Sequence, residues 1–226
     1  MKLTNREVIR IVSETVHPFM QCHGYLPLSS PTSGLFAKPA DGMEKRIAIV
    51  ANRPGRNREF RLDHYCHYRL PMHTGIHNKY LPYRTPREKK EAPTISHYYV
   101  NLIPSTEFVA VLDALSFHEL DGLEDAVSSF QFICEKFSFP FLDRFQSVQE
   151  IISGFQGGRE RWPVQDPIGR FQLILLDAVV HRDQPRFAHW KDEAMRFCES
   201  RIDGPATNLV QLASSLEREM AQISNP

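Results

Sequence analysis

The sequence predicts an α+β protein: an antiparallel sheet of about four strands with packed helices, followed by an α-helical C-terminal extension. Two patterns support this. Short apolar runs separated by turn residues fill most of the first half of the chain, as is typical of antiparallel strands. After Ser105 the apolar residues recur at helical spacing instead. With 226 residues and 42% hydrophobic content, the chain can bury a sizeable core.

The first expected element is an amphipathic helix. Thr4 and Glu7 have the spacing of a capping box. The apolar residues that follow recur at helical spacing, at Val8, Ile11, Val12, Val16 and Phe19. The sequence Cys22-His-Gly24 indicates the end of this helix, and Pro18 predicts a kink in its last turn.

Three strands are expected next, over residues 34–37, 46–51 and 59–70. Alternation in the third strand predicts an inward face of Phe60, Leu62, His64, Cys66, Tyr68 and Leu70. The outward face would consist of Arg61, Asp63, Tyr65, His67 and Arg69. Prolines and clustered charges predict a long surface loop over residues 71–93, and a further strand is expected from Ile95 to Ile103.

Helices are expected after two capping boxes, Ser116-Phe-His-Glu119 and Ser147-Val-Gln-Glu150. Three more should begin near Asp166-Pro167, Asp183-Gln-Pro185 and Gly204-Pro205. Residues 155–163 contain Gly157 and Gly158 and indicate a linker. The sequence therefore predicts two parts, an α+β domain at residues 1–155 and a helical extension at residues 156–226 packed on it.

The neutral net charge hides an asymmetry. Residues 45–90 contain twelve lysines and arginines against three acidic residues, so this segment carries +9 and the rest of the chain −9. Such a separation bears on partners rather than on fold. It favours an acidic partner, and it leaves open that the acidic remainder folds back onto the basic segment or binds it in another copy.

Several function classes receive little support. The N-terminus lacks the apolar stretch of a signal peptide, and the apolar run 171–180 is too short to span a bilayer, so a cytoplasmic protein is expected. The four cysteines are widely spaced and are expected to be reduced core thiols. Gly157-Gly158 lacks the Lys-Ser/Thr that follows in a phosphate-binding loop. No cofactor is implied, and a non-enzymatic role is favoured.

Some motifs are similar to those of a known family. They are the opening helix that runs into Gly24-Tyr25, the strands at Leu35-Phe36 and Ile47-Ala-Ile-Val50, and the block Phe139-Pro-Phe-Leu-Asp-Arg-Phe-Gln-Ser-Val-Gln-Glu-Ile151. Together they resemble the bacterial domain-of-unknown-function 4304 family over about residues 5–155. The resemblance implies a fold and a bacterial setting, and it supplies no catalytic residues. The chain departs from the family pattern at residues 71–93, in lacking a tryptophan-rich strand, and in the helices after Gly157.

Histidines cluster in the strand region, at His64, His67, His73, His77 and His97. A zinc site needs three or four converging ligands, and His73 with His77 is the weak candidate pair, since its spacing suits a helix. Because these residues fall in the expected loop and no HExxH glutamate is present, surface or core histidines are favoured over a metal-dependent hydrolase or nuclease.

Tyrosines gather beside the basic segment: six of the seven lie between Tyr65 and Tyr99. Tyrosine and arginine often anchor interfaces, although a solvated strand face would show the same pattern. We expect a protein-interaction module, such as a toxin-neutralising immunity protein or a defence-complex subunit, that binds an acidic protein partner. The predicted contact residues are Arg61, Tyr65, His67, Arg69, Tyr80, Tyr83 and Arg84. The alternative is nucleic-acid binding by the same surface.

Overall fold

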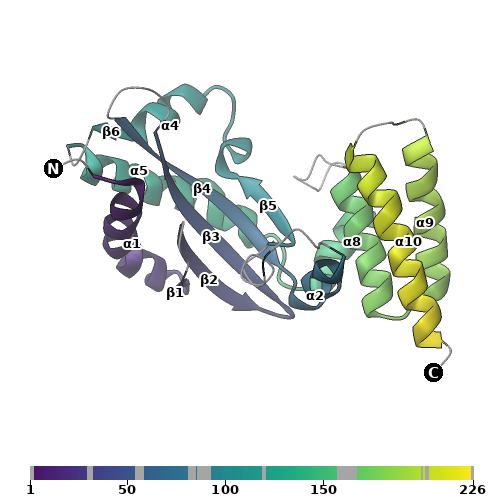
Figure 1. The fold of residues 1–226 in the computed structure, drawn as a ribbon. Helices are drawn as coiled ribbons and strands as arrows, with labels where there is room; N and C mark the ends of the chain where they lie inside the picture. Colours follow the sequence, from purple (N-terminus) through teal and green to yellow (C-terminus); the bar gives the residue numbers. More distant parts are fainter. Residues whose placement is uncertain are drawn as a thin grey trace. The chain divides into compact units, whose positions relative to one another are not determined.

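The structure is a computed structural model that describes residues 3–29, 33–53, 59–80, 85, 93–118, 121–156, 167–199, 201 and 204–224. The predicted α+β class is confirmed, because a strand-rich part with packed helices is followed by further helices (Figure 1). The backbone contacts define two compact units. Unit 1 comprises Met1–Tyr68 and Ser96–Gln146, and unit 2 comprises Arg69–Ile95 and Ser147–Pro226. The sequence predicted a single boundary after residue 155. The observed division differs, because unit 2 includes Arg69–Ile95 from the front half of the chain.

Unit 1 is built on the sheet. The strands are β1 (Leu26–Leu28), β2 (Gly34–Ala40), β3 (Met43–Asn52), β4 (Glu59–Arg69), β5 (Ile95–Tyr98) and β6 (Ser116–His118). Its helical segments are α1 (Asn5–Cys22), η1 (Tyr99–Leu102), α4 (Phe108–Ala114), α5 (Leu123–Ile133), η2 (Cys134–Ser138) and α6 (Phe139–Leu142). Within the described residues the strand order is β1-β2-β3-β4-β5, and β6 pairs with β4.

The predicted N-terminal helix is confirmed as α1. The hydroxyl of Thr4 accepts a hydrogen bond from the backbone N–H of Glu7, whose carboxylate accepts one from the backbone N–H of Thr4 in return. The helix continues through Pro18 to Cys22. One stripe of α1 is fully buried, formed by Val8, Val12, Val16 and Met20, and the helix packs against β2 and β3.

Two predicted elements of unit 1 are wrong. Ser116-Phe-His-Glu119 does not start a helix, because Ser116–His118 pairs with β4 and the ring of Phe117 stacks on that of Phe60 at 5.6 Å; Glu119 lies outside the described residues. The expected strand from Ile95 to Ile103 ends at Tyr98. It gives way to a 3₁₀ turn because Tyr99 is buried, with its ring stacked on that of His64 at 4.4 Å. In both places a tertiary contact overrides the local pattern.

The alternation predicted for β4 is half correct. The inward face is buried as expected, from Phe60 to Tyr68. The predicted outward face is only partly exposed, and Asp63 on that face is 1% exposed. The prediction of an outward Asp63 is therefore wrong, because the residue accepts hydrogen bonds that remove it from solvent.

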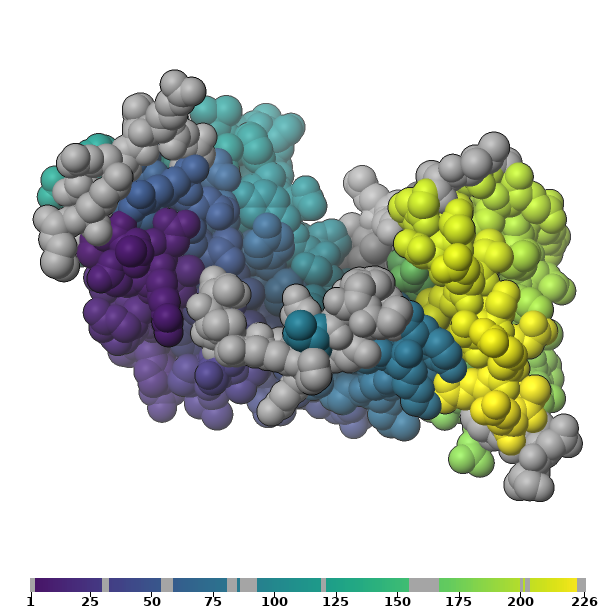
Figure 2. Space-filling model, viewed as in Figure 1, coloured from purple at the N-terminus to yellow at the C-terminus, as the bar shows by residue number. Residues whose placement is uncertain are grey.

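Unit 2 is helical. Its helices are α2 (Pro71–Lys79), α7 (Val148–Gln156), α8 (Pro167–Val180), α9 (Gln184–Glu199) and α10 (Gly204–Ser224). The last three pack side by side (Figure 1) and share one apolar core that includes Leu175, Phe187 and Leu216. In Figure 2 the outer surface of α10 is seen in yellow, and Glu217 and Arg218 are exposed on that helix. The three predicted C-terminal helices are thus confirmed.

The predicted surface loop over residues 71–93 is wrong in its first part. Pro71 occupies the first turn of α2, where its missing N–H costs nothing. His73 and Thr74 on this helix are buried. Most of the remainder of that loop, and most of the predicted linker at residues 155–163, lies outside the described residues.

The cysteines largely follow expectation. All four cysteines are free, and Cys66, Cys134 and Cys198 are buried. Cys22 is exposed at the end of α1, so the prediction of a core thiol is wrong there. In the described part of the chain, no helix combines the length and apolar character that crossing a bilayer would need.

A buried carboxylate connects three helices of unit 2. Asp177 on α8 is 0% exposed and lies 2.9 Å from Nε2 of His73 on α2 and 2.7 Å from a guanidinium nitrogen of Arg186 on α9. His181 lies farther away, at 3.5 Å. Burial alone would raise the pKa of Asp177, but hydrogen bonds and charges from His73 and Arg186 lower it below the ordinary value. The ionised carboxylate therefore stabilises the packing of α2, α8 and α9.

We expect Asp177→Asn to destabilise unit 2 at pH 7 and to matter less in acid. Because the pKa of Asp177 is lowered by folding, its contribution is present above about pH 4 and is lost as the pH falls through the lowered value. Thermal unfolding of wild type and variant should show a gap in Tm at pH 7 that narrows near pH 3. Asp192→Asn, at an exposed position on α9, is the control. A gap of equal size at both pH values would contradict the role of the ionised carboxylate.

Candidate functional site

The predicted contact residues are divided between the two units. Arg61, Tyr65 and His67 lie on β4 in unit 1, whereas Arg69 and Tyr80 fall in unit 2. Tyr83 and Arg84 lie outside the described residues. The hydroxyl of Tyr80 donates a hydrogen bond to Glu219, and its ring packs against the apolar core of unit 2. Tyr80 is therefore used within its own unit.

Asp63 organises the part of the site that lies in unit 1. Its two carboxylate oxygens each accept a hydrogen bond at 3.0 Å from the guanidinium of Arg61. Asn52 of β3 donates to one oxygen at 2.5 Å, and the hydroxyl of Tyr98 donates to the other at 2.6 Å. The hydroxyl of Tyr99 lies 3.3 Å from the same oxygen as Tyr98. Groups from β3, β4, β5 and η1 thus converge on one buried carboxylate.

The electrostatics of this cluster favour the charged carboxylate. Burial alone would raise the pKa of Asp63, but the hydrogen bonds from Arg61, Tyr98 and Asn52 lower it below the ordinary value. Burial and the neighbouring carboxylate raise the pKa of Tyr98 to about 12, so its hydroxyl keeps its proton and donates. The cluster is a fixed support for the side chains around it.

Two aromatic side chains of β4 form a row with Tyr98 of this cluster. We call the three residues Tyr65, His67 and Tyr98 the β4 aromatic face. The rings of Tyr65 and His67 are stacked with centroids 6.0 Å apart, and those of Tyr65 and Tyr98 lie 5.2 Å apart. All three residues are partly exposed. Burial, followed by the charge of Arg46, lowers the pKa of His67 to about 4, so this histidine is neutral near pH 7. The face is therefore aromatic and polar rather than cationic.

Most of the described cations of the basic segment are paired within the chain. Among its described cations, Lys45 pairs with Asp143 at 2.9 Å, Arg46 with Glu44, Arg61 with Asp63 and Lys79 with Glu219. Arg53 donates to the backbone carbonyl of Leu3 and lies over the ring of Phe60. Six further cations of the segment lie outside the described residues, at positions 56, 58, 84, 87, 89 and 90. Carboxylates of the acidic remainder thus offset part of the +9 excess, as the charge pattern had left open.

The histidines do not form a metal site in the described residues, where no group of three or more His, Cys, Asp or Glu side chains is placed to hold an ion. His73 and His77, the weak candidate pair, do share helix α2, but Nε2 of His73 already forms a hydrogen bond with Asp177. His64 is fully buried with Nε2 2.8 Å from the hydroxyl of Ser138, and burial lowers its pKa to about 3. Burial raises the pKa of the Cys66 thiol to about 12, so a reactive thiolate is not favoured there.

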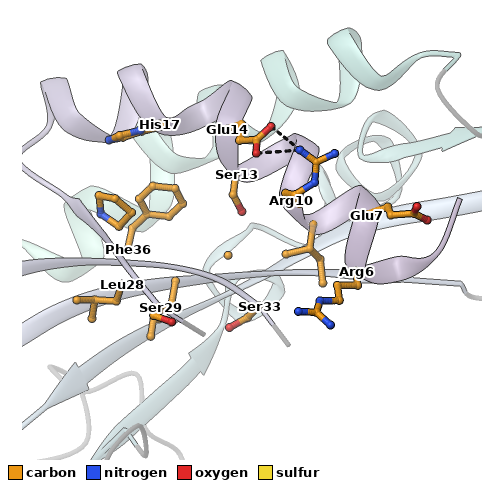
Figure 3. A pocket seen from close by; sticks show the side chains of 14 residues that line it. Arg6, Glu7, Arg10, Ser13, Glu14, His17, Leu28, Ser29, Ser33 and Phe36 are labelled. Atoms are coloured by element: carbon orange, nitrogen blue, oxygen red, sulfur yellow. Dashed lines mark hydrogen bonds and ion pairs between the residues drawn. The ribbon is translucent and has the colours of Figure 1, made fainter. Parts of the chain in front are cut away.

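The sequence pattern gave no sign of a cavity, yet unit 1 contains one. This α1–β2 cavity has a volume of about 480 Å³ and lies between one side of α1 and the strands β1 and β2. Helix α1 contributes polar and charged side chains, and the strands contribute apolar ones (Figure 3). The lining includes Arg6, Arg10, Ser13, His17, Leu28 and Phe36. Its volume falls in the usual range of small-molecule sites.

Gly34 is the one sequence signal that could have pointed to this cavity. It opens β2 and lines the cavity. A Cβ atom at this position would lie 2.1 Å from the hydroxyl oxygen of Ser13, so only glycine allows α1 and β2 this approach. The sequence alone does not reveal this role of Gly34, because the role depends on α1 lying over β2.

Comparisons with protein-family models, with curated proteins and with solved structures found no match to this chain. The resemblance to the bacterial domain-of-unknown-function 4304 family therefore remains a hypothesis.

We expect Asp63→Ala to lower the free energy of unfolding of unit 1 by about 3 kcal/mol, because it leaves Arg61 without its carboxylate in a partly buried site. Urea unfolding followed by circular dichroism measures this. Asp113→Asn, exposed on α4, is the control and should change stability by less than about 0.5 kcal/mol. Equal effects of the two substitutions would show that Asp63 does not organise the sheet.

Proposed function

We propose that the protein is a non-enzymatic interaction module that binds an acidic protein partner through the β4 aromatic face. The observation that carries this is the row of neighbouring, partly exposed rings of Tyr65, His67 and Tyr98 beside the buried Asp63. Tyrosine provides a large contact area and a polar group, and it loses few degrees of freedom on binding. Because Asp63 already fixes Tyr98, part of the ordering cost of binding is met before the partner arrives.

Arg61, next to the face on β4, offers hydrogen-bond donors that a partner could use. Arg61 remains a quarter exposed, and Asp63 uses two of the five N–H donors that a guanidinium offers. A carboxylate of a partner is the complement to the remaining donors. The acidic character of the partner thus rests on local contacts with Arg61 rather than on the net charge of the segment.

A bacterial setting, and within it an immunity protein or a defence-complex subunit, is supported only by the family resemblance. Nucleic-acid binding, the alternative, needs cations that can follow phosphates along a strand. Five of the six described cations of the basic segment instead have carboxylate or carbonyl partners in the chain, as does Lys45 with Asp143. For this reason the protein partner is favoured.

The test is affinity capture from the source cells with wild type and Tyr65→Ala side by side. Phe132→Ala, which removes another exposed aromatic side chain of unit 1, is the matched control. We expect an acidic protein that wild type and the control retain and Tyr65→Ala loses. With the purified pair, Tyr65→Ala should raise Kd by about tenfold or more.

Nuclease treatment separates the two candidate functions. Retention that survives nuclease and depends on Tyr65 supports the protein partner. Retention that disappears with nuclease, together with a steep loss of binding as salt rises, would favour nucleic acid instead. If Tyr65→Ala and Phe132→Ala retain the same proteins, the β4 aromatic face is not the binding surface.

A further inference from the structure

The α1–β2 cavity has the composition of a ligand site and is independent of the β4 aromatic face. The polar side of α1 that lines it runs from Arg6 to His17, a length of about 16 Å at the helical rise of 1.5 Å per residue. Opposite this helix lie Leu28, Leu35 and Phe36 of the strands. One wall can therefore contact an apolar body while the other supplies polar contacts.

Ser13 presents an unsatisfied hydroxyl in this cavity. Its Oγ atom is buried and has no hydrogen-bond partner among the described residues. A helical hydroxyl commonly donates to the carbonyl four residues earlier, as Thr15 does to Ile11 at 2.8 Å, but Ser13 does not. Figure 3 shows Ser13 pointing from α1 towards the strand wall that carries Leu28 and Ser33. Buried polar atoms are normally paired, so this oxygen is poised for a ligand.

The charges around the cavity favour an anion. Its two acidic side chains are already engaged: Glu7 accepts hydrogen bonds from Thr4, and Glu14 accepts them from Arg10. Arg6 is exposed and has no ion-pair partner among the described residues. The Arg10–Glu14 pair is 63% exposed on both sides, so it is weak and Arg10 can turn to another carboxylate. The groups that remain available are therefore the hydroxyl of Ser13, the guanidinium of Arg6 and, when it leaves Glu14, the guanidinium of Arg10.

An added peptide strand fits the cavity less well than a small molecule does. β1 is the edge strand, and it has only three residues with Pro27 in the middle. Proline lacks the N–H that strand addition uses, and it is a common means of blocking a sheet edge. Leu28 nevertheless remains 40% exposed beside the cavity, which suits contact with an apolar chain.

We infer that the α1–β2 cavity binds a small carboxylate with an apolar body. The carboxylate accepts hydrogen bonds from Arg6 and Ser13, and the body lies against Leu28 and Phe36. Gly34 leaves room for the hydroxyl of Ser13 between α1 and β2, because a side chain there would displace that hydroxyl.

The test is an NMR titration of the full chain with octanoate, octanamide and octylamine, which share an apolar chain and differ in the head group. We expect octanoate to shift the amide signals of Ser13, Leu28 and Ser33, with octanamide weaker and octylamine weakest. Arg6→Gln should weaken octanoate by about tenfold, the value of one hydrogen bond to a charged group, and should leave octanamide unchanged. Arg6 is exposed, so this variant is not expected to affect folding.

Arg196→Gln, at an exposed position in unit 2, is the control and should not alter octanoate binding. Ser13→Ala provides a second variant and should also weaken octanoate. The inference is overturned if octanamide binds as well as octanoate, if the shifts fall outside the cavity, or if an acidic pentapeptide binds there and octanoate does not. Because Tyr65→Ala leaves the cavity intact, octanoate binding by that variant separates this inference from the proposed function.

Discussion

The ionised carboxylate of Asp63 is the constraint on which the exposed side of unit 1 depends. Burying a charge costs several kcal/mol unless it is paired and hydrogen-bonded. Here the carboxylate is 1% exposed and is compensated by Arg61, Asn52 and Tyr98. These donors come from three neighbouring strands, so satisfying one charge also fixes the lateral positions of β3, β4 and β5. The aromatic rings beside Asp63 are therefore held in fixed positions.

The same interaction changes the meaning of the charge pattern. Counted along the chain, residues 45–90 carry +9, which suggests a surface that attracts acidic partners. In the folded chain, Lys45 forms an ion pair with Asp143, and Lys79 forms one with Glu219. The two residues of each pair are far apart in sequence. A charge count along the chain cannot include such pairs, since it takes no account of folding. The groups left to contact a proposed partner are the N–H donors of Arg61 and the rings of the β4 aromatic face.

Local pattern predicted much of the fold. The capping box at Thr4, the buried face of β4 from Phe60 to Tyr68, and the C-terminal helices depend on neighbouring residues and on burial of one face. The errors occur where distant groups decide the outcome. Prolines and clustered charges suggested a loop from Pro71 onwards, but His73 forms a hydrogen bond with Asp177, 104 residues later, and residues 71–79 are helical. Phe117 similarly joins the sheet because it stacks on Phe60.

The candidate sites show the same limit. Tyr65 and His67 could be predicted from strand alternation, because side chains two residues apart share a face. Tyr98 could not be assigned to that face, because its position depends on the hydrogen bond to Asp63 from another strand. Local pattern gave no indication of the α1–β2 cavity. In the sequence, Gly34 resembles any turn glycine. Its role depends on α1, from which Ser13 occupies the space of the missing side chain.

Asp63 and Gly34 thus break the local rule for a strand in opposite ways, and each lies beside a candidate site of unit 1. A buried charge at Asp63 gathers donors and fixes an aromatic face, whereas the absent side chain at Gly34 makes room for the unsatisfied hydroxyl of Ser13. Departures from local consistency commonly mark functional positions. Because the two lie on different strands and involve different partners, substitution at one should leave the other intact, and the two proposed binding properties can be tested separately in one protein.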